Sequence, residues 1–257
     1  MSVHVASVGM GRYGKRPEGL IDLAAEAATL ALEGVGRRPI DLLVAGSMLA
    51  HGKHGSEALL PRLVARLGLE AASGLRVDSA SGTGGMAFYA AALALETGRF
   101  ERALVVAAEK RTDRTTATNT KELAASLDAS EVAAGATMPG LAAIVTQRYL
   151  QRFSRTSEIC DAATVHARAM SVDNPAAHFQ KAVTADEVAR SRIVSVPLRL
   201  LHCSAISASP DAATGWPRPM TPPLGFTGIR PSRRTSPRSN ATGPCPTSQS
   251  PRSSMWM

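Results

Sequence analysis

The sequence predicts an α/β fold in which a mostly parallel sheet is covered by helices. Through about the first 110 residues, apolar runs of strand length alternate with longer segments whose apolar residues recur at helical spacing. The strand-length runs are apolar throughout, which indicates burial on both faces. Such strands favour parallel pairing beneath covering helices.

The predicted elements alternate between strand and helix. Strands are expected at Val3–Val8, Leu42–Ala45, Leu75–Val77 and Ala103–Ala107. Helices are expected at Leu20–Glu33, Glu57–Leu67 and Gly85–Glu96, with Gly34 and Gly98 as stop signals. Beyond residue 110, helical pieces are expected near Leu141–Phe153 and Asp186–Ser191, the second capped by Thr184.

Composition indicates a globular protein of a reducing compartment. Hydrophobic residues make up 44% of the 257-residue chain, and no apolar run reaches the ~18 residues of a membrane helix. No leader segment is recognisable, so we expect a cytoplasmic protein without a membrane span. Cys160, Cys203 and Cys245 have neither disulfide nor metal-ligand spacing, and we interpret His51 and His54 as solvated loop residues, so no metal is expected.

The last fifty residues, 208–257, differ in composition from the rest. They hold ten of the sixteen prolines and six arginines against one acid, so they carry +5 of the formal net charge of +8. Their apolar residues follow no period, which predicts disorder. We also hypothesise an altered reading frame here, and expect no nucleic-acid binding because the basic residues form no compact cluster.

A glycine pattern follows the first predicted strand. Gly9-Met-Gly-Arg-Tyr-Gly14 matches the dinucleotide-binding spacing, but that site needs a helix to start at once. Five residues, Lys15 to Gly19, intervene before the helical period begins near Leu20. We therefore interpret the pattern as a structural turn and not as a nucleotide site.

Residues 75–95 predict a strand, a tight glycine-rich turn and an alanine-rich helix, with Ser81 at the crest of the turn. The free N–H groups and positive dipole end of such a helix face a side chain leaving the strand, which suits a nucleophile. A serine there is also a common helix-capping residue.

Several ordered stretches resemble the thiolase family, especially the sterol-carrier-protein-type and related acyl-CoA thiolases. They are Val8-Gly-Met-Gly-Arg-Tyr-Gly-Lys-Arg16, Ile40-Asp-Leu-Leu-Val-Ala-Gly46, Leu104-Val-Val-Ala-Ala-Glu-Lys-Arg-Thr-Asp113, Gly135-Ala-Thr-Met-Pro-Gly140, Asn174-Pro-Ala-Ala-His-Phe179 and Pro197-Leu-Arg-Leu-Leu-His-Cys-Ser-Ala-Ile-Ser207. The resemblance spans about residues 3–207. It implies an acyl-CoA acyltransferase that takes coenzyme A as substrate and needs no other cofactor.

The chain departs from the family pattern in two ways. Ser81 stands where thiolases carry their nucleophilic cysteine. After Ser207 the family would continue with a small-residue strand that returns to the sheet, and then with a second half carrying a catalytic histidine and a second cysteine. We therefore expect a thiolase-like domain at 1–110, a loop region at 111–207, a disordered tail at 208–257 and a sheet edge left unpaired.

Three functions remain open on this evidence. The first is an incomplete thiolase-type acyltransferase. The second is an inactive subunit that pairs, through the smooth third helix, with a complete CoA enzyme or with its own copy. The third is a Ser81-dependent thioesterase. A Ser81-dependent thioesterase needs a histidine beside Ser81. Met138 is a candidate for the acyl pocket or a core filler. Arg111, Arg114 and Lys121 would meet CoA phosphates or form a solvated charged segment.

Overall fold

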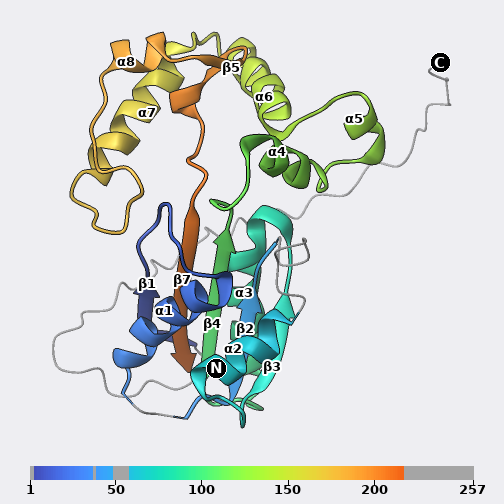
Figure 1. Cartoon of the computed structure of the whole chain (residues 1–257), viewed down its shortest axis with the longest axis vertical. Helices are drawn as coiled ribbons and strands as arrows, with labels where there is room; N and C mark the ends of the chain where they lie inside the picture. Colours follow the sequence, from blue (N-terminus) through green and yellow to red (C-terminus); the bar gives the residue numbers. More distant parts are fainter. Residues whose placement is uncertain (1–2, 37–38, 49–57, 217–257) are drawn as a thin grey trace, which may run out of the picture. The chain divides into compact units, whose positions relative to one another are not determined.

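A five-stranded sheet forms the centre of the fold in the computed structural model, which describes residues 3–36, 39–48 and 58–216. Its strands lie in the order β1-β7-β4-β2-β3 (Figure 1). Their bounds are β1 His4–Met10, β2 Leu42–Gly46, β3 Ser73–Val77, β4 Ala103–Lys110 and β7 Ala208–Trp216. Four of these strands match the predicted ones, with ends shifted by at most three residues.

The sheet is mixed, although most of its strands share one direction. Strand β2 pairs in parallel with β3 and β4, placing Val44 opposite Leu75 and Val105. Strand β7 is antiparallel to both β1 and β4. Since β1 and β4 both oppose β7, only β7 runs against the other four strands.

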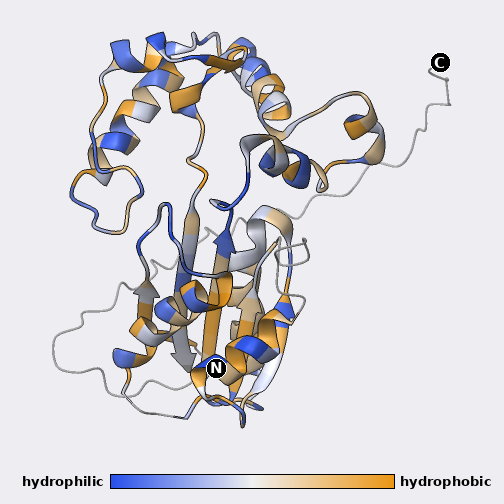
Figure 2. Cartoon of the chain, in the orientation of Figure 1, coloured by the Kyte–Doolittle hydropathy of each residue, from blue (hydrophilic) through white to orange (hydrophobic). Residues whose placement is uncertain are grey.

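Helices cover both faces of the sheet. Helix α1 (Leu20–Glu33), whose predicted bounds are confirmed, and α2 (Leu59–Leu67) pack on one face with Leu43, Leu104 and Val106. Helix α3 (Thr83–Glu96) packs on the other with Leu42, Val44 and Val105. Figure 2 shows the parallel strands β2 and β4 as mainly hydrophobic, as expected for strands covered on both sides.

The prediction of disorder from residue 208 is wrong for 208–216, because this segment is strand β7 between β1 and β4. The side chains of Ala208, Pro210, Ala212 and Thr214 alternate into the buried layer under α1. Strand β7 pairs with the side of β4 that faces away from β2 and links β1 to the sheet, so the expected unpaired edge at this position is also wrong. The remainder of the predicted tail, 217–257, lies outside the described residues.

The glycine pattern after the first strand serves close packing. A Cβ at Gly9 would lie 2.1 Å from the Ala27 carbonyl oxygen of α1, and one at Gly11 would lie 2.7 Å from Pro210 Cγ. Gly14 has φ +145° and bridges to Ala208. These contacts, and the start of α1 only at Leu20, agree with the structural interpretation of the pattern.

Residues 111–207 form short helices and one small hairpin. They comprise α4 Thr116–Ala124, α5 Ala129–Ala133, α6 Met138–Arg152, α7 Glu158–Ser171, α8 Ala185–Arg190, β5 Ile193–Ser195, β6 Leu198–Arg199 and the 3₁₀ turn η2 Leu200–His202. Helices α6 and α8 confirm the predicted pieces. The Thr184 hydroxyl caps α8 by accepting from the Glu187 N–H, as predicted.

Candidate active-site turn and ligand cavity

The predicted strand, turn and helix around Ser81 are present. Strand β3 ends at Val77, a 3₁₀ turn η1 spans Ala80–Gly82, and α3 starts at Thr83. Ala80 has φ +47°, a left-handed conformation that costs a non-glycine residue roughly 1–2 kcal/mol. The turn therefore stores strain directly before Ser81, as functional turns often do.

Hydrogen bonds from both sides hold this strained turn. The Thr83 hydroxyl donates to the Ala80 carbonyl at 2.7 Å and accepts from the Ser79 N–H at 2.9 Å. The Asp78 carboxylate accepts from the Ala80 N–H at 3.0 Å. Since Thr83 is buried, its hydroxyl anchors residues 79 and 80, which directly precede Ser81.

Ser81 is exposed beside an uncapped helix end. No side chain caps the N-terminus of α3, and the first turn of the helix carries no acid. Its free N–H groups would stabilise negative charge at residue 81. Within the described ranges, however, no side chain hydrogen-bonds the Ser81 hydroxyl, so no base that could activate it is visible there.

The buried histidine of the loop region, His202, is committed elsewhere. Its Nε2 lies 2.7 Å from Asp161 Oδ1, and its Nδ1 accepts from the Arg199 N–H. With both ring nitrogens used, His202 donates from Nε2 and fixes η2 to α7. His51 and His54 lie outside the described residues.

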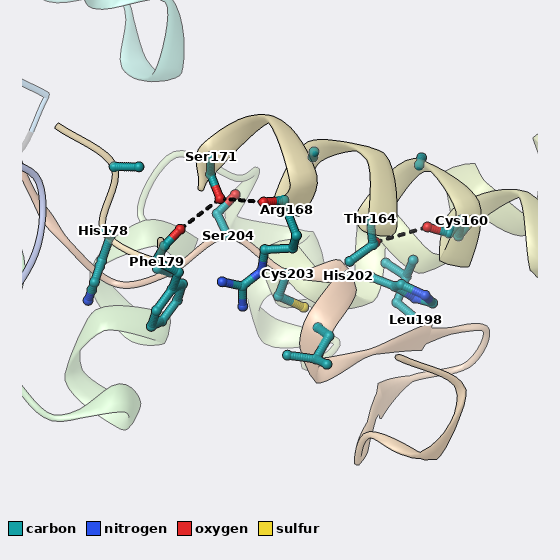
Figure 3. Close-up of a pocket in the computed structure, with 15 residues that line it drawn as sticks. Cys160, Thr164, Arg168, Ser171, His178, Phe179, Leu198, His202, Cys203 and Ser204 are labelled. Carbon is teal, nitrogen blue, oxygen red and sulfur yellow. Dashed lines mark hydrogen bonds between the residues drawn. The ribbon is translucent and has the colours of Figure 1, made fainter. Parts of the chain in front are cut away.

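A cavity of about 560 Å³ lies along α7, between this helix, residues 177–179 and the segment 198–205 (Figure 3). Much of its wall is apolar, from Ala163, Ala167, Leu198 and Leu201. Arg168, His178 and Cys203 add polar groups. Its volume suits a small organic ligand, for which pockets of roughly 300–1,000 Å³ are typical.

The other sequence candidates do not join this cavity. Met138 is the first residue of α6 and is not part of the cavity wall, and neither is Ser81. The structure thus does not bring Ser81 and Met138 together at one pocket. The interpretation of Arg111 and Arg114 as solvated is wrong. Arg111 is buried and its Nε donates to Asn119 Oδ1 at 2.8 Å. The side chain of Arg114 is 5% exposed and pairs with Glu122 at 2.9 Å. Lys121 is exposed.

Comparison with known proteins agrees with this fold. Residues 4–203 match the family model of the thiolase N-terminal domain. The chain belongs to the thiolase family. An acetyl-CoA acetyltransferase of Methanocaldococcus jannaschii is 33% identical over 208 residues, which are 79% of this chain and 53% of that protein. The benzoylsuccinyl-CoA thiolase subunit BbsB of Thauera aromatica is 29% identical, covering 87% of this chain and 57% of its own length.

Solved structures share the fold. The Ltp2-ChsH2(DUF35) aldolase superposes with a TM-score of 0.66 at 22% identity, covering 83% of this chain and 55% of that one. The acetyl-CoA acetyltransferase from Syntrophomonas wolfei gives 0.64 at 21% identity, with coverages of 83% and 64%. The chain spans about half the length of the curated relatives it matches. None of its described helices is long and apolar enough to cross a bilayer.

Proposed function

We propose that this chain is the acyl-CoA-binding part of a thiolase-type acyltransferase, with Ser81 at the nucleophile position, and that it needs a second chain for turnover. The observation that carries this proposal is the strained turn. Its geometry suits a nucleophile, whereas serine replaces the cysteine that the family would place there. Coenzyme A is the proposed co-substrate.

The chemistry of serine explains the need for help. A helix N-terminus lowers a thiol pKa far enough to give a thiolate near neutral pH. A serine hydroxyl starts too high for this and requires an adjacent base. Because no such base adjoins Ser81 in the described ranges, we expect acyl-CoA binding without sustained thiolysis by the chain alone.

The outer face of α3 supports a protein partner. Met86, Phe88, Tyr89 and Leu93 expose 42–55% of their surface along one helix. A helix that is apolar all round is normally covered on all sides. One relative is named as a thiolase subunit. We therefore infer that this face contacts a second copy or a thiolase-related chain.

Two measurements on the full chain test the proposal. Calorimetric titration should detect binding of acetyl-CoA, and an acetoacetyl-CoA thiolysis assay should show no turnover by the chain alone, even for Ser81→Cys. Absence of any CoA binding would contradict the family function, and sustained turnover would contradict the need for a second chain.

A matched pair of variants tests the partner face. Tyr89→Glu should lower the mass measured by light scattering, because it places a charge on α3. Met170→Glu is the control, since Met170 is 69% exposed on α7. Equal masses for both variants and the wild type would contradict an interface at α3.

A further inference from the structure

Arg168 brings a positive charge to the cavity without an acidic partner. Its guanidinium carbon lies 4.3 Å from the centre of the Phe179 ring, and both residues line the cavity (Figure 3). Through the part of the chain that the structure describes, the guanidinium makes no hydrogen bond and no ion pair. Asp161, which is also on α7, is paired with His202.

The contact with Phe179 leaves Arg168 available for a ligand. The cation–π contact with Phe179 uses no hydrogen-bond donor, so the N–H groups of the guanidinium stay free. The Phe179 ring is itself fixed by His178, whose ring lies 4.3 Å away at an interplanar angle of 21°. This arrangement orders a long side chain without satisfying its hydrogen-bond donors.

The surroundings of Arg168 are electropositive. Burial lowers the pKa of His178, and the positive charges of Arg168 and Lys15 lower it further. His178 Nδ1 is buried and has no hydrogen-bond partner. Among the residues that line the cavity, Arg168 carries a positive charge and none is acidic.

We propose that Arg168 binds an anionic group of the CoA ester, by a two-pronged hydrogen bond to a carboxylate or phosphate. The proposal rests on the acyl-CoA binding proposed above and adds the chemistry of the recognised group. That group is either a carboxylate on the acyl chain, which the apolar wall of alanines and leucines would surround, or a phosphate of CoA. Both present paired oxygens that match the guanidinium edge.

A matched pair of ligands distinguishes the two sources. Glutaryl-CoA and valeryl-CoA carry acyl chains of equal length. The glutaryl chain ends in a carboxylate, and the valeryl chain ends in a methyl group. If Arg168 binds the carboxylate, the full chain should bind glutaryl-CoA about tenfold more tightly, as one charged hydrogen-bonded contact implies. Arg168→Gln should remove that difference, and Arg168→Lys should keep part of it. If Arg168 binds a phosphate, Arg168→Gln should weaken CoA and both esters by the same factor.

Arg152→Gln is the control variant, because Arg152 also approaches an aromatic ring, at 5.8 Å from Phe153, but does not line the cavity. It should leave all affinities unchanged. Equal binding of every ligand by wild type and Arg168→Gln would overturn the inference while leaving the proposed function intact. Absence of CoA-ester binding by the wild type would overturn both.

A second readout does not depend on a variant. The pKa of His178, followed by NMR, should rise when glutaryl-CoA is bound if the carboxylate is recognised, because the anion offsets the charge of Arg168. A rise with CoA and both esters would support phosphate recognition. An unchanged pKa with all three bound ligands would overturn the inference.

Discussion

Thr83→Val should destabilise the candidate active-site turn by removing one buried hydroxyl. That hydroxyl donates to Ala80 at 2.7 Å and accepts from Ser79 at 2.9 Å. Each such bond contributes roughly 0.5–1.5 kcal/mol net, so losing two should lower the free energy of unfolding by about 2 kcal/mol. Valine has nearly the shape of threonine, so little of this loss arises from packing.

Urea denaturation of the full chain measures this effect, with Thr97→Val as control. Thr97 lies at the other end of α3, and its hydroxyl donates to Ala94 at 2.7 Å but is exposed to water. Water replaces that bond, so the control should lose at most about 0.5 kcal/mol. Equal losses for the two variants would refute the argument that Thr83 anchors the turn.

Two further predictions concern β1 and the loop that follows it. Gly9→Ala should destabilise the fold by about 3 kcal/mol, because its Cβ would meet the Ala27 carbonyl oxygen at 2.1 Å, whereas Gly85→Ala, with open space around it, should be neutral or slightly stabilising. Equal denaturation midpoints would contradict the packing argument. The pKa of Tyr13 is raised, first by burial and then by its hydrogen bond to Asp211, so its stabilisation is complete below about pH 10 and is lost as pH rises further. Unfolding measured between about pH 8 and about pH 11 should show a steeper loss for wild type than for Tyr13→Phe, and parallel curves would contradict the prediction.

The spacing of apolar residues along the sequence predicted the helices and strands that bury one regular face. Helix α1 was predicted to the residue because its apolar side chains recur at helical spacing and Gly34 follows. Strand β7 was missed because Pro210 and Asp211 argue against a central strand. This segment forms a strand because it pairs with β1 and β4, which are distant in sequence. A local sequence pattern cannot predict such pairing. Helix α7 was also missed, since it buries no residue completely.

The same contrast applies to the functional residues. The turn at Ser81 was predictable because strand, glycine-rich turn and helix are contiguous in sequence. The cavity was not, because its polar groups come from separate segments. Arg168 meets Phe179 across a loop, and His202 pairs with Asp161 from 41 residues away. Spacing along the chain carries no signal for such contacts.

Residue 81 is proposed to occupy a nucleophile position whose chemistry serine cannot perform. The decisive measurement is the alkylation rate of Ser81→Cys with iodoacetamide at about pH 6.5. The control is Ser73→Cys, at the exposed start of β3. A thiol at the α3 N-terminus should have a pKa below the ordinary ~8.5. Each unit by which the pKa falls raises the thiolate fraction about tenfold but makes the thiolate less nucleophilic. The alkylation rate should therefore rise about threefold or more per unit. Faster alkylation of Ser81→Cys than of Ser73→Cys is the predicted result. Equal rates in two folded proteins would contradict the claim.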